Sequence, residues 1–178
     1  MKKNNIRNYV VDKEAKRGVR YVGEYYVTDI PDEKRRRDGA LQLLFGFGQI
    51  IAVFAALMIP SIGSVTVYVI IPLECILFCA MAYISGSYAF MRSDAKIEQK
   101  IYDRAYGNRI QVITVAIVFN SVSFLGQLFV IIKKSPGFGD YFLLAIITVM
   151  LLLHIIVWRY HKKLLGLVRP EKTSTVSR

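Results

Sequence analysis

Four hydrophobic stretches of this sequence each carry a polar side chain near the middle. These side chains are Gln49, Glu74, Asn120 and His154. An acid or base at the centre of a membrane helix costs on the order of 2.5–3.5 kcal/mol on insertion scales, so such residues usually face protein and mark functional sites. At about 1.5 Å of rise per residue, with helix directions alternating, all four lie within roughly 8 Å of one another along the membrane normal. We therefore expect one buried polar layer, in which Glu74 and His154 share a proton or form an ion pair.

Two interpretations of Glu74 are open. In the first, Glu74 is a proton, cation or cationic-substrate site. Pro72 leaves the carbonyl oxygen of Tyr68 without its donor, which predicts a kink, and a kink beside an intramembrane acid is typical of transporters with broken helices. In the second, Glu74 is protonated or paired and only joins helices, within this chain or with a partner chain. For His154 we expect a hydrogen bond between helices rather than a proton relay.

Small residues predict where helices approach one another closely. Gly48, Ala52 and Ala56 recur every four residues in the first stretch, and Ala82 and Gly86 form a second small pair. A third face is both small and polar, and its members are Ala116, Asn120, Ser123 and Gln127. We expect this face to point at protein and not at lipid.

The elements that must position these residues are four membrane-spanning helices. The hydrophobic stretches run over about residues 40–60, 65–88, 110–132 and 141–160. Crossing about 30 Å of hydrocarbon takes roughly 20 helical residues, and a chain inside hydrocarbon must satisfy its backbone internally. The apolar fraction of 54% and the mean hydropathy of +0.38 are too high for an ordinary soluble domain. The expected fold is an all-α integral membrane protein, an antiparallel four-helix bundle.

The basic residues predict the orientation of this bundle. The chain has 24 Lys and Arg against 13 Asp and Glu, a formal net charge of +11. Lys133 and Lys134 lie between the third and fourth stretches, and all the other basic residues fall on the opposite side, so both termini are expected in the cytoplasm. Topology thus accounts for the charge, and no nucleic-acid partner is expected.

The expected location is the plasma membrane, in a bacterial cell. The bilayer itself is then a partner, because a basic cluster directly before the first stretch should meet anionic headgroups on the cytoplasmic side. Its members are Lys34, Arg35, Arg36 and Arg37.

Three segments outside the stretches are expected in the cytoplasm: residues 1–38, 91–109 and 161–178. Within the first, β-branched and aromatic residues at 8–11 and 19–27 predict a hairpin, or a segment that orders only on binding. The loop 91–109 predicts a short amphipathic helix that Ser93 caps, with Ile97 and Ile101 on one face. The tail after Arg169 is expected to be unstructured.

Motifs for catalysis, metal or cofactor binding are absent from the sequence. Cys75 and Cys79 are four residues apart in an apolar stretch, unlike an accessible C-x-x-C redox pair, so we interpret them as packing residues. A metal site at Glu74 and these cysteines would need a fourth ligand such as His154, and none is expected. There is no phosphate loop and no pair of carboxylates. We expect no enzyme, no metal and no cofactor.

Two functions are compatible with this pattern. The first is a non-catalytic subunit or regulator of a membrane complex, which contacts another membrane protein, or itself, through the small residues around Gly48. The alternative is a homo-oligomeric proton- or cation-coupled transporter or channel, with Glu74 as the ion site and Asn120, Gln127 and His154 along the path. The first is favoured slightly, because contacts between helices explain the polar layer equally well.

Overall fold

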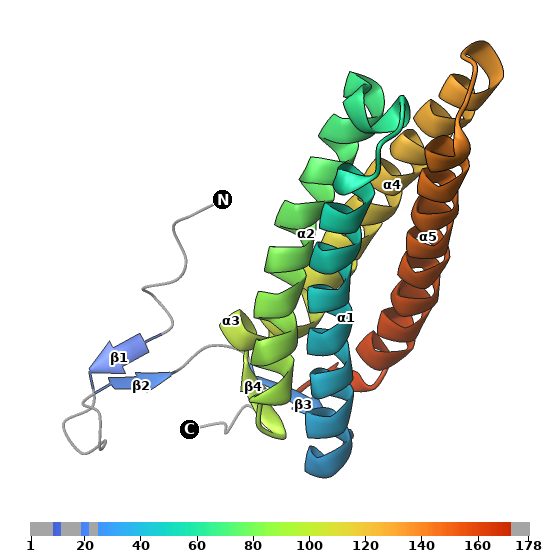
Figure 1. Ribbon diagram of the computed structural model, residues 1–178. Helices are drawn as coiled ribbons and strands as arrows, with labels where there is room; N and C mark the ends of the chain where they lie inside the picture. Colours follow the sequence, from blue (N-terminus) through green and yellow to red (C-terminus); the bar gives the residue numbers. More distant parts are fainter. Residues whose placement is uncertain (1–8, 12–18, 22–24, 172–178) are drawn as a thin grey trace.

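The computed structural model describes residues 9–11, 19–21 and 25–171. Within these residues, four helices are long and apolar enough to cross a membrane, as the sequence predicts. They are α1 (Asp32–Met58), α2 (Val67–Met91), α4 (Asn108–Lys133) and α5 (Phe138–Leu165). In Figure 1 they run side by side, with the short connections α1–α2 and α4–α5 at one end, which we call the loop end.

Local sequence features mark the ends of the long helices. Asp32 and Glu33 occupy the first turn of α1, directly after Pro31, where the helix dipole favours negative charge. The connection from α1 to α2 contains a short 3-10 turn, η1 (Gly63–Val65). Both α1 and α5 extend beyond the hydrophobic stretches. Most of the additional residues are polar, and most lie at the end of the molecule opposite the loop end.

The helices pack in the order α1, α2, α4, α5, and α1 also meets α5 with fewer close backbone approaches. Buried residues recur on α1 at alternating intervals of three and four, which defines one inward face. These residues are Gly39, Gln42, Gly46, Gln49, Val53 and Ala56. A Cβ atom added at Gly46 would lie 2.5 Å from Ile84 Cγ1, so this glycine permits the close approach of α1 to α2.

A three-stranded antiparallel sheet lies at the end opposite the loop end, which we call the sheet end (Figure 1). Its strands are β4 (Lys96–Glu98), β3 (Tyr25–Thr28) and β5 (Val168–Pro170), in that order. Tyr26 in the central strand is paired with Ile97 on one side and Pro170 on the other. A hydrophobic cluster that includes Ile30, Phe90 and Leu164 packs with Ile97 beside it.

The sheet corrects two predictions for the connecting segments. Residues 91–109 do not form one amphipathic helix: β4 is followed by α3 (Gln99–Tyr102) and a π-helical turn, η2 (Asp103–Gly107), that leads directly into α4. Ile97 is buried in the sheet while Ile101 is exposed, because pairing with a distant strand overrides local helical periodicity. The tail is also ordered through Pro170, since β5 pairs with β3.

The N-terminal hairpin that residues 8–11 and 19–27 predict is present as two shorter paired strands. β1 (Tyr9–Val11) pairs antiparallel with β2 (Val19–Tyr21), with Tyr9 opposite Tyr21. The predicted turn, residues 12–18, lies outside the described residues. The second predicted strand is divided, because residues 25–28 belong to β3 in the other sheet.

Candidate functional site

Three of the four predicted mid-helix polar residues meet between the helices. His154 Nδ1 lies 2.7 Å from the carbonyl oxygen of Met150, its acceptor, which leaves Nε2 to accept from the Gln49 side-chain amide at 2.9 Å. The side-chain nitrogen of Asn120 lies 3.5 Å from His154 Nδ1. All three side chains are buried, and His154 is 1% exposed. The predicted layer therefore joins α1 to α5 by the hydrogen bond between Gln49 and His154, and Asn120 of α4 lies beside the histidine.

Glu74 does not belong to this layer. Its side chain is exposed, and it forms no hydrogen bond or ion pair with any residue that the structure describes. The inward face of α2 carries Leu73, Ile76 and Ala80, whereas Glu74 shares the outward face with Phe78, which is 69% exposed. The expected pairing of Glu74 with His154 is therefore not found, because equal depth in two helices does not fix their rotation.

Gln127 lies in a different polar contact, at the loop end. Its side-chain nitrogen donates to the backbone carbonyl of Asp140 at 2.9 Å. The Asp140 carboxylate in turn accepts from the backbone N–H groups of Gly63, at 3.1 Å, and Gly137, at 3.0 Å. Asp140 thus caps α5 and ties it to η1, a role that its place just before a hydrophobic stretch could have indicated.

Pro72 is buried, and α2 continues through it as one helix. The missing backbone donor of Pro72 affects the carbonyl of Tyr68. At the neighbouring residue the Ser123 hydroxyl of α4 donates to the carbonyl of Val69 at 3.2 Å. At Pro72, α2 is thus a continuous helix, with a side chain from α4 bonded to its backbone beside the proline.

A second polar layer, which the sequence did not predict, lies nearer the sheet end and draws on all four long helices. Tyr83 of α2 and His161 of α5 are in hydrogen-bond contact at 2.9 Å. The Tyr160 hydroxyl donates to the Asp38 carboxylate, which joins α5 to α1. Asp38 and His161 lie just outside the hydrophobic stretches, whereas Tyr83 and Tyr160 lie near their sheet-end limits, and only the packing of the long helices brings the four together.

Arg109 is the buried cation of this second layer. Its guanidinium is 1% exposed; Nη1 donates to Gln42 Oε1, and Cζ lies 4.6 Å from the centre of the Phe90 ring. Arg109 Nε and Nη2 have no hydrogen-bond partner among the described residues. A Cβ added at Gly86 would lie 2.5 Å from Arg109 Cγ, so Gly86 makes room for this side chain. Ala82, which the sequence pairs with Gly86 as a second small residue, is exposed.

The three small residues of the predicted stripe on α1 differ in their burial. Ala56 is buried in the core and Ala52 packs half-buried against it. Gly48 is exposed, with nothing within 4 Å of an added Cβ. Only Gly48 therefore remains available for contact with another helix.

The four residues of the basic cluster before the first stretch also differ in their burial. Lys34, Arg36 and Arg37 are exposed, as contact with headgroups requires. Arg35 is 3% exposed, pairs with Asp32 and donates to the carbonyl of Ile30 at 3.4 Å. Arg35 is therefore a structural residue at the start of α1, because its position on the helix turns it inward.

Within the described part of the chain, no three His, Cys, Asp or Glu side chains are grouped so as to hold a metal ion, and Cys75 and Cys79 are free thiols. The sequence matches no protein-family model, and comparisons with curated proteins and with solved structures found no match.

Proposed function

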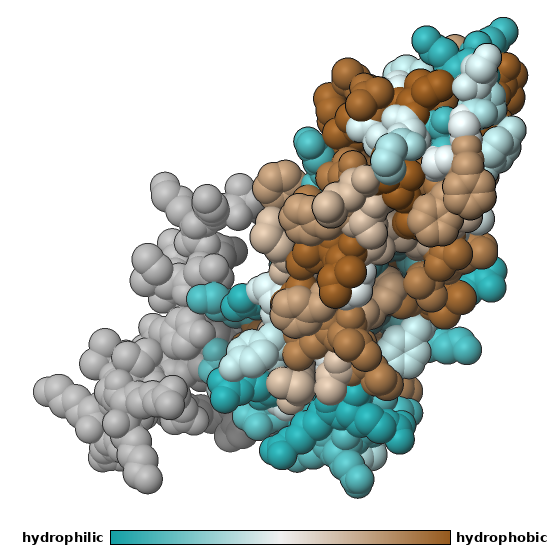
Figure 2. Space-filling model, in the orientation of Figure 1, coloured by the Kyte–Doolittle hydropathy of each residue, from teal (hydrophilic) through white to brown (hydrophobic). Residues whose placement is uncertain are grey.

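We propose that this protein is an integral membrane protein that acts as a non-catalytic subunit or regulator of a membrane complex. Figure 2 supports insertion in a bilayer, because apolar side chains cover the middle of the helices and polar ones gather toward the ends. Large apolar side chains face outward on every long helix, among them Leu44, Phe78, Leu125 and Ile156. So extensive an apolar surface indicates contact with lipid or with other proteins.

In this proposal the four helices form an antiparallel bundle with the sheet end in the cytoplasm. Lys133 and Lys134 lie at the loop end, whereas residues 34–37, 92–109 and 159–169 hold the other basic residues of the segment 25–171, toward the sheet end. Positive residues favour the cytoplasmic side, so both termini are placed there. We propose the plasma membrane of a bacterium as its location.

The outward position of Glu74 is the observation that carries the proposed role. Placing a lone acid in hydrocarbon costs on the order of 2.5–3.5 kcal/mol on insertion scales. The inward polar contacts are made without Glu74, so it has no evident task inside the chain. A membrane helix of another protein that presents an amide or basic side chain to Glu74 removes this cost and creates a specific contact.

A single chain does not bring the residues of the transport alternative together along one path. Gln49 and Asn120 each lie against His154, Gln127 is bonded to Asp140, and Glu74 faces outward, so these side chains do not line one path. A transport path at Glu74 would need two or more copies that meet at α2. The oligomeric composition of the protein in its own membrane therefore separates the two functions.

The test is native mass spectrometry of the tagged protein after gentle extraction from its own membranes. We expect a heteromeric mass, and Glu74→Leu is expected to weaken the association roughly tenfold, which lies within the range of about 1–2 kcal/mol found for polar contacts between model membrane peptides. Leu152→Ala, which changes an exposed side chain of α5, is the matched control and should leave the complex intact.

Two results would contradict the proposal. A mass made only of copies of this chain would favour the transport alternative, which pH-dependent uptake by proteoliposomes of the wild type and of Glu74→Gln would then examine. A heteromeric complex that Glu74→Leu and Leu152→Ala leave equally stable would remove Glu74 from the contact.

A further inference from the structure

A groove of about 880 Å³ opens on the side of the helices toward the sheet end. Its walls come from α2, from α3 and η2, and from the first turns of α4. It is separate from the layer around His154, which lies between the helices. The groove has one polar and one apolar part, and the two parts recognise different chemistry.

The polar part is positively charged. Lys100, Arg104 and Arg109 line it, and Asp103 is the one acid among its lining residues. Arg104 and Lys100 are exposed, and Arg104 Nε donates to the Ser85 hydroxyl at 3.1 Å, which holds the guanidinium against α2. Three cations against one carboxylate make this part of the groove a favourable place for an anion.

Arg109 supplies a second, independent indication of an anion. It is almost fully buried and forms no ion pair with a described carboxylate, and two of its three guanidinium nitrogens have no partner there. A buried charge is costly unless it is paired and hydrogen-bonded. Arg109 is among the residues that line this groove, but its unpartnered nitrogens are buried and its guanidinium is directed to Gln42 and Phe90. An anion beside Lys100 and Arg104 would therefore offset its charge through space and not by a hydrogen bond.

The apolar part indicates that the anion is one end of an amphipathic molecule. Phe78, Ala82 and Val115 line the groove and are exposed, and they lie farther along α2 and α4 toward the loop end than Lys100 and Arg104. A small soluble anion would leave these side chains uncovered. A hydrocarbon chain would cover them and run parallel to the helices.

We propose that the groove binds one anionic phospholipid, with its phosphate at Lys100 and Arg104 above Arg109 and an acyl chain along Phe78, Ala82 and Val115. The inference relies on the proposed insertion in a membrane, and it is independent of the proposed role as a complex subunit. Basic pockets between membrane helices on the cytoplasmic side are known to suit anionic lipid headgroups. The site is distinct from the exposed residues Lys34, Arg36 and Arg37 at the start of α1.

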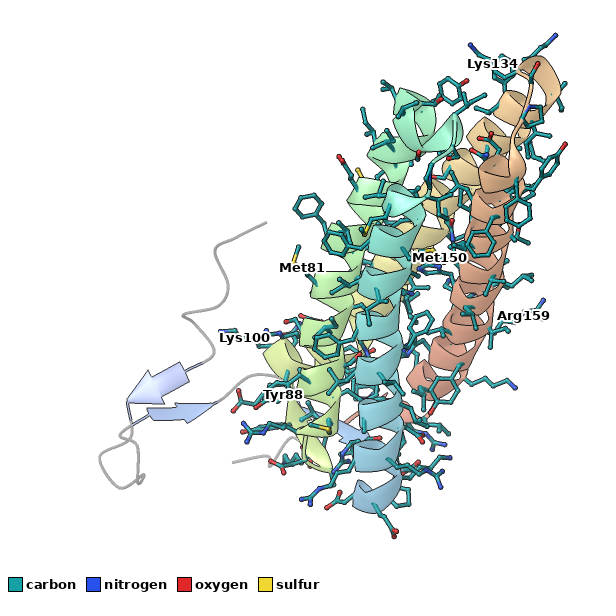
Figure 3. All side chains as sticks on the ribbon, viewed as in Figure 1. Met81, Tyr88, Lys100, Lys134, Met150 and Arg159 are labelled. Carbon is teal, nitrogen blue, oxygen red and sulfur yellow. The ribbon has the colours of Figure 1, made fainter. Side chains whose placement is uncertain are left out.

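The experiment measures lipid retention by native mass spectrometry on the full chain, purified from nanodiscs that contain equal amounts of phosphatidylglycerol and phosphatidylcholine. We expect one retained phosphatidylglycerol per chain. The variants Lys100→Gln and Arg104→Gln should each weaken retention about fivefold, in line with the energy of one basic residue near an anionic membrane. Arg159→Gln is the matched control: Figure 3 shows Lys100 and Arg159 projecting on opposite sides, and Arg159 is exposed on α5.

A further variant separates lipid from a free anion. Ala82→Trp fills the apolar part of the groove without changing any charge, and Ala82 is exposed, so the fold is expected to tolerate it. It should abolish retention of phosphatidylglycerol, whereas 10-fold more inorganic phosphate than lipid should not displace the lipid from the wild type. The proposal is overturned if phosphate displaces the lipid, if phosphatidylcholine is retained equally, or if Arg159→Gln acts as strongly as Arg104→Gln.

Discussion

Tyr160 of α5 donates a hydrogen bond from its hydroxyl to the carboxylate of Asp38 on α1. The two helices have few close backbone approaches, so this contact and the one between Gln49 and His154 hold them together over part of their length. Asp38 is buried, and its other partner, Arg37, lies 3.6 Å away and is itself exposed. The hydrogen bond between Tyr160 and Asp38 therefore joins α1 to α5 where the two helices pack together only sparsely.

Removal of the Tyr160 hydroxyl is the first prediction. Tyr160→Phe leaves the buried Asp38 carboxylate without its closest donor, which costs about 1–3 kcal/mol of unfolding free energy. Reversible unfolding in mixed detergent micelles measures the change. Tyr141→Phe, at an exposed position at the other end of α5, should have no effect. Equal stability of the two variants would show that the Asp38 contact contributes nothing.

The second prediction concerns the coupling between Gln49 and His154. A double-mutant cycle with Gln49→Leu and His154→Phe should give a coupling free energy of about 0.6 kcal/mol, and not more than about 1.7 kcal/mol, the range found for hydrogen bonds between membrane helices. Unfolding measurements in micelles on the wild type, both single variants and the double variant supply the four values. Strict additivity would mean that the two side chains do not interact.

Two glycines on opposite faces of α1, only two residues apart, give the third prediction. Gly46→Leu is expected to lower the melting temperature sharply, because even the first side-chain carbon would meet Ile84 at 2.5 Å. Gly48→Leu should leave the melting temperature nearly unchanged, since that position is open. Thermal unfolding followed by circular dichroism compares them. If Gly48→Leu instead disrupts only the association with a partner, Gly48 belongs to the complex interface.

The sequence predicts the helices well because their signal is local. Twenty or so apolar residues in succession specify a helix in hydrocarbon irrespective of what surrounds them. The meeting of Gln49, Asn120 and His154 also followed from a simple quantity, their depth. Glu74 differed because depth does not determine the direction in which a residue points, and α2 is apolar on all sides, so its sequence has no pattern that marks its inward face.

The sheet and the layer around Arg109 could not be predicted, because both depend on contacts between distant segments. Ile97 lies in a segment whose spacing suggests a helix, and only its pairing with Tyr26 makes it a strand residue. Arg109 resembles any basic residue at the edge of a hydrophobic stretch. Its burial depends on the space left by Gly86 and on a helix that begins before the stretch does.

The central position of β3 has a consequence for how the chain is made. β3 precedes α1, but its two neighbours, β4 and β5, come from after α2 and after α5. During synthesis, the residues of β3 leave the ribosome before those of β4 and β5, so the sheet can be completed only after α5 has been translated. A chain that stops before Val168 leaves one edge of Tyr26 unpaired. Until β5 is made, the β3 edge that it covers stays open to pairing with another strand, so β5 both closes the sheet and protects this edge.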